Sequence, residues 1–178
     1  VSSKNTTPGH EGKINTFTDT LLYFSTRNSK DKYIVDYNLG INIPTGKTKL
    51  SSYERNARMD EDLVRFAEFG EGWNFTPGIA VTRRIWGDKD LLTVGTSYSF
   101  KGAYDPTSDI DDDKLNPGNE WQKYLRWQHA EEKWQLVGEV LHTSSAESKI
   151  ADGTAFDTGA VWETRLTYNR NLSKDQAL

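Results

Sequence analysis

Residues 91–101 read LLTVGTSYSFK, and large side chains alternate in them with small or polar ones. The two alternating sets are Leu92, Val94, Thr96, Tyr98 and Phe100, and Thr93, Gly95, Ser97, Ser99 and Lys101. Successive side chains of a β-strand point to opposite faces of its sheet. This period of two therefore predicts a strand with one apolar face and one polar face.

The same alternation recurs along the chain and predicts seven strands. They cover residues 16–27, 33–43, 73–86, 91–101, 120–130, 133–143 and 160–170. Strands of about ten residues are long for a soluble sheet, whereas a tilted strand that crosses a membrane needs about 9 to 11 residues. The strand lengths therefore favour a membrane protein.

The connections between the predicted strands alternate in length. Short polar turns are expected at 28–32, 87–90 and 131–133, and long polar links at 44–71, 102–119 and 144–159. Short turns on one side and long loops on the other are typical of outer-membrane barrels. The predicted fold class is thus all-β, an antiparallel up-and-down transmembrane β-barrel, with residues 1–178 forming a single barrel domain or part of one.

Seven strands by themselves leave two unpaired sheet edges. In lipid each unpaired backbone group costs several kcal/mol, so closure by further strands or by another chain is required. The order of long and short connections also predicts that another strand precedes residues 16–27. We therefore expect this chain to be an internal portion of a longer barrel.

The composition argues against several classes of function. The chain has no cysteine, which rules out disulfides, thiolate metal sites and a cysteine nucleophile. Its 22 basic and 26 acidic residues are mixed along the chain, without the basic block that nucleic-acid binding requires. No segment approaches the roughly 20 apolar residues of a membrane-spanning helix, but insertion by strands stays open.

Polar side chains on the small-residue side of the strands are candidates for lining a barrel lumen. These candidates are Asp36, Asn38, Asn42, Arg84, Ser97, Ser99, Arg126, Glu139, Glu163 and Arg165. Opposed charges from different strands would set a field across a pore and select solutes. Alternatively, the charges pair with one another and only fill the interior of a narrow barrel.

The other side of the strands carries an apolar band that would face lipid. Its aliphatic members are Val35, Leu39, Ile41, Ile79, Val81, Leu92, Val94, Leu125, Leu136, Val140 and Leu166. Aromatic residues near strand ends or on this side match the girdles of an outer-membrane barrel. They are Trp121, Trp127, Trp134, Trp162 and Tyr168.

Residues 44–48, PTGKT, look like the end of a phosphate-binding loop. In such a loop four residues separate a first glycine from the Gly-Lys-Ser/Thr sequence. Here five residues separate Gly40 from Gly46. Pro44 more simply ends a strand, because it lacks the ladder donor, and Gly46 allows a turn. No nucleotide site is predicted, and Lys47 and Lys49 are expected in solvent at the rim.

The acidic segment 105–120 contains weak candidates for calcium ligands. The residues that match positions one, three, five and twelve of a calcium loop are Asp109, Asp111, Asp113 and Glu120. Lys114 stands where that loop requires Gly, so a solvated acidic loop is the simpler interpretation. The three histidines are far apart in the sequence. We therefore predict no catalytic residue, no metal site and no cofactor, and we do not expect an enzyme.

Four short motifs resemble a known family. They are GINIPTGKTKL (40–50), FGEGWNFTPGIAVTRR (69–84), GTSYSFKGAYDP (95–106) and LNPGNEW (115–121). In these motifs the chain is similar to the outer-membrane β-barrel family called "MetA-pathway of phenol degradation". The resemblance spans roughly residues 33–145 and implies a bacterial outer-membrane channel that admits aromatic or other hydrophobic compounds. It brings no catalytic residues.

Three hypotheses about function follow. The first is a porin-like channel for passive uptake of small molecules across a Gram-negative outer membrane, with membrane lipid and solutes as partners. The second is a soluble or secreted lipocalin-like barrel that binds ligands with its apolar side inward. The mean hydropathy of −0.76 favours this second hypothesis. The third is a structural barrel that sheathes or anchors a partner protein.

Overall fold

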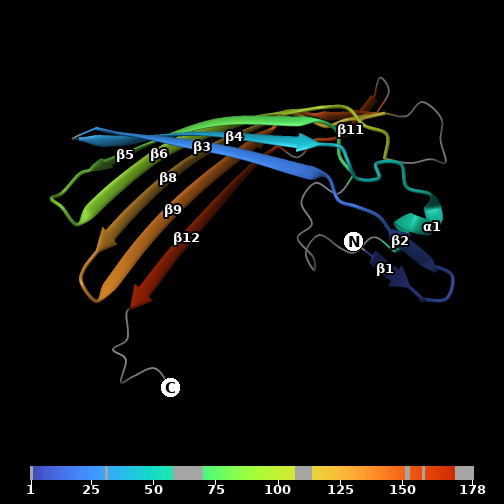
Figure 1. The fold of residues 1–178 in the computed structure, drawn as a ribbon, viewed down its shortest axis with the longest axis horizontal. Helices are drawn as coiled ribbons and strands as arrows, with labels where there is room; N and C mark the ends of the chain where they lie inside the picture. Colours follow the sequence, from blue (N-terminus) through green and yellow to red (C-terminus); the bar gives the residue numbers. More distant parts are fainter. Residues whose placement is uncertain are drawn as a thin grey trace, which may run out of the picture.

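The computed structural model shows an all-β protein, and it describes residues 2–30, 32–57, 70–106, 114–150, 153–157 and 159–170. Its main element is a seven-stranded antiparallel sheet with the order β12-β9-β8-β6-β5-β4-β3 (Figure 1). The strands are β3 (Thr20–Lys30), β4 (Tyr33–Ile43), β5 (Asn74–Arg84), β6 (Asp90–Lys101), β8 (Glu120–Ala130), β9 (Trp134–Ser145) and β12 (Ala160–Arg170). All seven predicted strands are confirmed. The first is shifted toward the C-terminus, from 16–27 to Thr20–Lys30.

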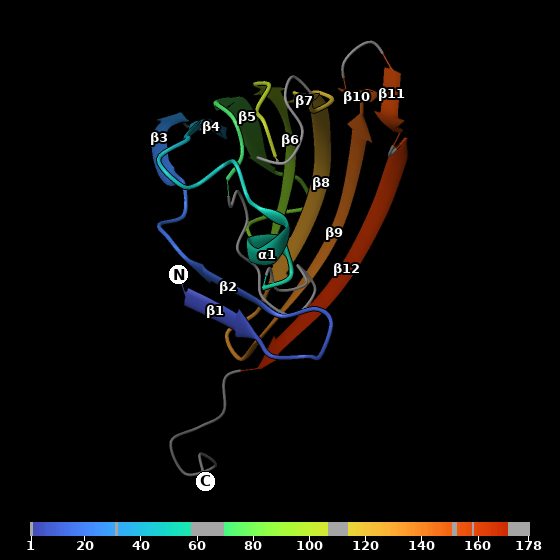
Figure 2. The same cartoon turned by 90° about the vertical axis from the view of Figure 1, so that its right-hand side faces the viewer.

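Short elements form in the segment before β3 and in the predicted long links. β1 (Ser2–Asn5) and β2 (Gly12–Asn15) form a two-stranded sheet, and α1 (Ser52–Arg55) follows β4. The other short strands, β7 (Leu115–Asn116), β10 (Ser148–Ile150) and β11 (Gly153–Phe156), form a three-stranded sheet. All these elements lie near one end of the large sheet, which we call the long-link end (Figures 1 and 2). The opposite end, with the turns β3–β4, β5–β6 and β8–β9, is the short-turn end.

The large sheet is curved but does not close into a barrel (Figure 2). Its outermost strands, β3 and β12, each pair on one side only among the described residues. Six antiparallel steps separate these two strands, so they run in the same direction and cannot form an antiparallel pair with each other. The expectation of a barrel is therefore met only as an open sheet of seven strands.

The cross-strand register sorts the side chains onto two faces. We call the face that carries Val94 the apolar face and the face that carries Ser97 the polar face. The buried residues of the seven strands are Asn42, Asn74, Ala80, Gly95 and Val137, which lie on the polar face, and Asp90, which lies on the apolar face. Side chains converge on the inside of a curved sheet and splay on the outside. The polar face is accordingly the concave side.

Gly95 keeps the middle of the concave side open for a tyrosine ring. A Cβ atom at Gly95 would lie 2.2 Å from Cε1 and 2.5 Å from Cζ of Tyr124. Tyr124 is the neighbour of Gly95 in the β6–β8 ladder, so its ring lies across β6 where no side chain stands. The small residue at position 95 therefore follows from packing within the sheet.

Replacing Gly95 with alanine should force the Tyr124 ring to move. We expect the G95A variant to lower the free energy of unfolding by about 1–3 kcal/mol in urea titrations. Gly138→Ala is the matched control, because its Cβ would meet only Cε3 of Trp127 at 3.9 Å. Equal losses in the two variants would contradict this packing argument. In a Tyr124→Ser background Gly95→Ala should cost less, because the ring that the methyl group displaces is absent.

Candidate functional site

The register places all ten predicted lumen candidates on the polar face. The candidates of β4, β5 and β6 form one group, linked by the ladders between these neighbouring strands. The candidates of β8, β9 and β12 form a second group, linked in the same way. The β6–β8 ladder connects the two groups. The candidates therefore share one concave surface, although they do not gather at a single point. That this surface lines a lumen stays a prediction.

One group of charges on this surface is centred on Glu139. In the cross-strand register Glu139 lies between Arg126 of β8 and Arg165 of β12. Arg126 Nε is 3.6 Å from Glu139 Oε1, which is an ion pair beyond hydrogen-bond distance. This Nε is buried and has no hydrogen-bond partner within the described part of the chain. The group holds two guanidinium groups around one carboxylate.

A second pair of charges lies on the same face, near the opposite edge of the sheet, on β3 and β4. Arg27 Nε donates to Asp36 Oδ1 at 2.6 Å, and Arg27 Nη2 donates to Asp36 Oδ2 at 3.1 Å. This two-pronged geometry is the strong form of an arginine–carboxylate pair. Asp36 also interacts electrostatically with Tyr124, three strands away. Arg27 was not among the predicted residues, although it is the last residue of the predicted strand 16–27.

The remaining candidates have more local roles. Ser99 shares a hydrogen bond of 2.8 Å with Thr76, and Asn38 accepts one of 2.8 Å from the Tyr23 hydroxyl. Arg84 pairs with Asp88 at 3.2 Å at the short-turn end, so it stands at the margin of the concave surface. In each of these contacts the partner is a residue outside the candidate set.

Asp19 accepts hydrogen bonds from three segments at the long-link end. It was not among the residues predicted from the sequence. Its Oδ2 accepts from Asn42 Nδ2 at 2.9 Å and from the Glu71 backbone N–H at 3.0 Å, and its Oδ1 accepts from the Gly46 N–H at 2.9 Å. Asp19 and Asn42 are both buried, Asn42 with only 2% of its surface exposed. One carboxylate thus joins the segments before β3, after β4 and before β5. A lone aspartate before a strand gives no sequence signal for this role.

These contacts explain PTGKT without a phosphate. The Gly46 N–H, which would have to face a phosphate, already donates to Asp19, and a Cβ there would lie 2.8 Å from Asp19 Oδ1. Lys49 pairs with Asp105 at 2.6 Å, and Lys47 donates a hydrogen bond to Glu54. That bond, with help from the Ser51 backbone N–H, holds the pKa of Glu54 below its ordinary value. Both lysines therefore have carboxylate partners at the rim.

The apolar face has aromatic rings toward both ends. Toward the short-turn end, neighbouring ring centroids are 6.2 Å apart for Trp127–His129, 5.1 Å for His129–Trp134 and 6.2 Å for Trp134–Tyr168. Toward the long-link end, the pairs are Tyr98–Phe100 at 4.7 Å, Phe75–Phe100 at 6.3 Å and His142–Trp162 at 4.3 Å. Aliphatic side chains lie between the two aromatic zones.

This outer surface is unusually exposed for an apolar one. Leu166 is 75% exposed and Trp162 is 68% exposed. Val94, Leu125, Ile79 and Val81 in the middle of the sheet are exposed as well. A continuous exposed apolar surface of this kind marks contact with lipid or with another protein.

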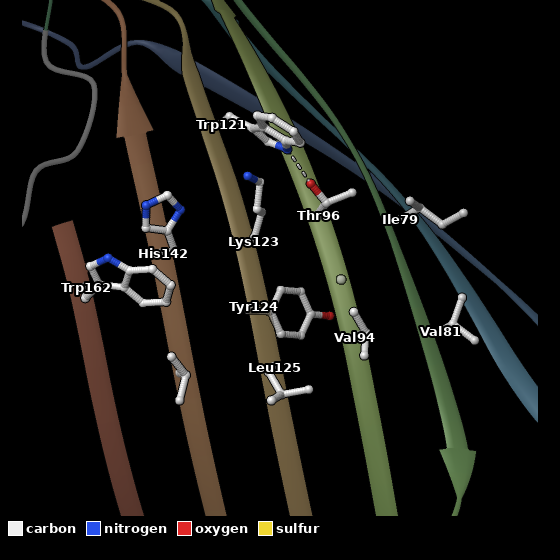
Figure 3. A pocket seen from close by; sticks show the side chains of 12 residues that line it. Ile79, Val81, Val94, Thr96, Trp121, Lys123, Tyr124, Leu125, His142 and Trp162 are labelled. Atoms are coloured by element: carbon white, nitrogen blue, oxygen red, sulfur yellow. Dashed lines mark hydrogen bonds between the residues drawn. The ribbon is translucent and has the colours of Figure 1, made fainter. Parts of the chain in front are cut away.

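A shallow groove of about 620 Å³ crosses the apolar face from β5 to β12 (Figure 3). Its aliphatic part is lined by Ile79, Val81, Val94, Leu125 and Val140. Its other part holds Lys123 and His142 between Trp121 and Trp162. The groove therefore combines an aliphatic bed with a basic, aromatic end.

The described residues test little of the predictions about calcium ligands and catalytic residues. Asp109, Asp111 and Asp113 lie outside the described residues, and Glu120 is paired with Lys101 at 2.6 Å. Within the described ranges, no group of three histidine or acidic side chains could hold a metal ion. The helical residues that the structure describes form no helix long and apolar enough to span a membrane.

No protein-family model matches the chain, and no curated protein matches it significantly. The resemblance to the phenol-degradation family therefore stays a prediction.

Changing Asp19 to asparagine should loosen the long-link end. The amide cannot accept hydrogen bonds at both of its positions, so at least one buried donor loses its partner, and we expect a loss of about 2 kcal/mol in the free energy of unfolding. Asp88→Asn is the control, because the Asp88 side chain is 92% exposed and its ion pair contributes little. A loss in D19N no larger than in D88N would contradict the role of Asp19.

Proposed function

We propose that the protein is part of an outer-membrane β-barrel channel through which small molecules diffuse passively. The observation that carries this proposal is the division of the sheet into two faces. The concave face bears the ten polar candidates, and the convex face is aliphatic in the middle and aromatic toward both ends. A barrel around a polar lumen in a membrane has this arrangement.

The charge distribution supports the choice of a channel. The concave face carries carboxylates and guanidinium groups together, including the Glu139 group and the Arg27–Asp36 pair. The convex face of the seven strands has one carboxylate, Asp90, which binds Trp127 and His129 near the short-turn end. Charges of both signs facing a water-filled path can select solutes, whereas carboxylates facing lipid would be costly.

A complete barrel requires strands beyond the seven described here. β3 and β12 run in the same direction, so an antiparallel barrel closes only with an odd number of additional strands. Eight strands in all would be nearly filled by side chains, and twelve or more could leave a solute path. The channel proposal therefore concerns the closed assembly. Aromatic or hydrophobic solutes are proposed only on the basis of the family resemblance.

The ligand-binding alternative requires the opposite curvature. A lipocalin-like barrel places its apolar side chains inside, whereas here they lie on the convex side. The structural alternative, a barrel that sheathes a partner, is compatible with the same faces. Stoichiometric co-purification of a partner protein, together with absence of conductance, would favour that alternative.

Conductance across planar bilayers tests the proposal. We expect purified full-length protein to give conductance steps with a measurable preference between anions and cations. Arg165→Gln should shift the permeability ratio toward cations and Glu139→Gln toward anions, each about twofold for one charge screened by water near the path. No steps and no solute flux from inserted protein would refute a channel.

The matched control for Arg165 is Arg83, whose position in the β5–β6 ladder puts it on the convex face. Arg83→Gln removes the same charge and should leave the ion preference unchanged. A shift as large as that of Arg165→Gln would mean that the concave face does not define the path.

A further inference from the structure

The groove on the convex face has the chemistry of a lipid site. Its aliphatic bed lies in the middle of the sheet, and its basic end lies toward the long-link end (Figure 3). Lys123 stands three positions into β8, so it is about 10 Å along the strand from the long-link end. In a membrane-spanning sheet this depth is close to the headgroups, which a lysine reaches by extending its chain.

Lys123 lies over the Trp121 ring and has no acidic partner among the residues that the structure describes. Its Nζ lies 3.6 Å from the centroid of the Trp121 ring, and Trp121 Nε1 donates to Thr96 Oγ1 at 2.7 Å. In the ladders its neighbours are Thr96 and His142, neither of which carries a negative charge at neutral pH. No described carboxylate lies within ion-pair distance of it. The ammonium charge is thus positioned but not neutralised.

The surrounding charges favour an anion. The convex face of the seven strands carries Lys30, Arg83, Lys123 and Arg170, against Asp90 as its one carboxylate. The imidazole of His142 is the neighbour of Lys123 in the β8–β9 ladder. Its ring centroid lies 4.3 Å from that of Trp162. A ligand that fills the whole groove must therefore pair an anionic head with a hydrocarbon chain.

We infer that this groove binds one phospholipid of net negative charge, with an acyl chain on the aliphatic bed and the phosphate at Lys123 and His142. The inference rests on the proposed membrane placement of the sheet and goes beyond it by naming a specific lipid contact. Free phosphate lacks the chain that the larger part of the groove accommodates.

Tryptophan quenching by brominated lipids tests the site. Full-length protein is placed in phosphatidylcholine vesicles that contain increasing fractions of brominated phosphatidylglycerol or of brominated phosphatidylcholine. We expect the wild type to prefer phosphatidylglycerol about fivefold, the value for one lysine near an anionic headgroup. Lys123→Gln should abolish the preference, and Lys123→Arg should retain it.

Arg83→Gln is the control, since it removes the same charge from the same face outside this groove. The inference is wrong if Lys123→Gln keeps the preference, or if Arg83→Gln loses as much of it. Should Lys123→Gln fail to fold, His142→Phe keeps a ring beside Trp162 without the nitrogens and should weaken the preference. An unchanged preference in that variant also overturns the site.

Three further results show whether the lipid assignment alone fails or the channel proposal fails with it. If inorganic phosphate at constant ionic strength removes the preference, the site takes a free anion and the lipid assignment is wrong. If brominated phosphatidylcholine quenches the tryptophans but no lipid is preferred, the sheet enters the bilayer and only this inference fails. If neither brominated lipid quenches, the membrane placement fails and both proposals fall together.

Discussion

The rest of the structure depends on an unbroken antiparallel register across seven strands. Because side chains alternate with a period of two, a slip of one residue in any ladder would move that strand's apolar set to the concave side and its charges to the convex side. The register that is observed keeps every aliphatic member of the predicted band on one face. Hydrogen bonding of the backbone and segregation of the side chains are thus one constraint.

The strands and their faces could be predicted because they depend on local pattern. Residues 91–101 show the alternation without reference to any other part of the chain, and β6 was found as Asp90–Lys101. The division of candidate residues between faces was also foreseeable, since it needs only the parity of each position within its strand. That Asp109, Asp111 and Asp113 bind calcium is not tested by the described residues.

What could not be predicted involves residues far apart in the chain. Asp19 accepts hydrogen bonds from Gly46 and Glu71, which are 27 and 52 positions away. The residues next to Asp19 in the sequence do not predict these contacts. The fit of the Tyr124 ring over Gly95 likewise involves two residues on different strands. PTGKT illustrates the difference, because its local likeness to a phosphate loop is explained by a distant carboxylate.

An odd number of strands also fixes sidedness. The chain enters β3 at the long-link end and leaves β12 at the short-turn end (Figure 1). In any membrane that the sheet crosses, the polypeptide before β3 and the polypeptide after β12 consequently lie in different compartments. A protease or a label confined to one compartment would reach only one of these two flanks, so the orientation of the sheet can be read without knowledge of what it transports.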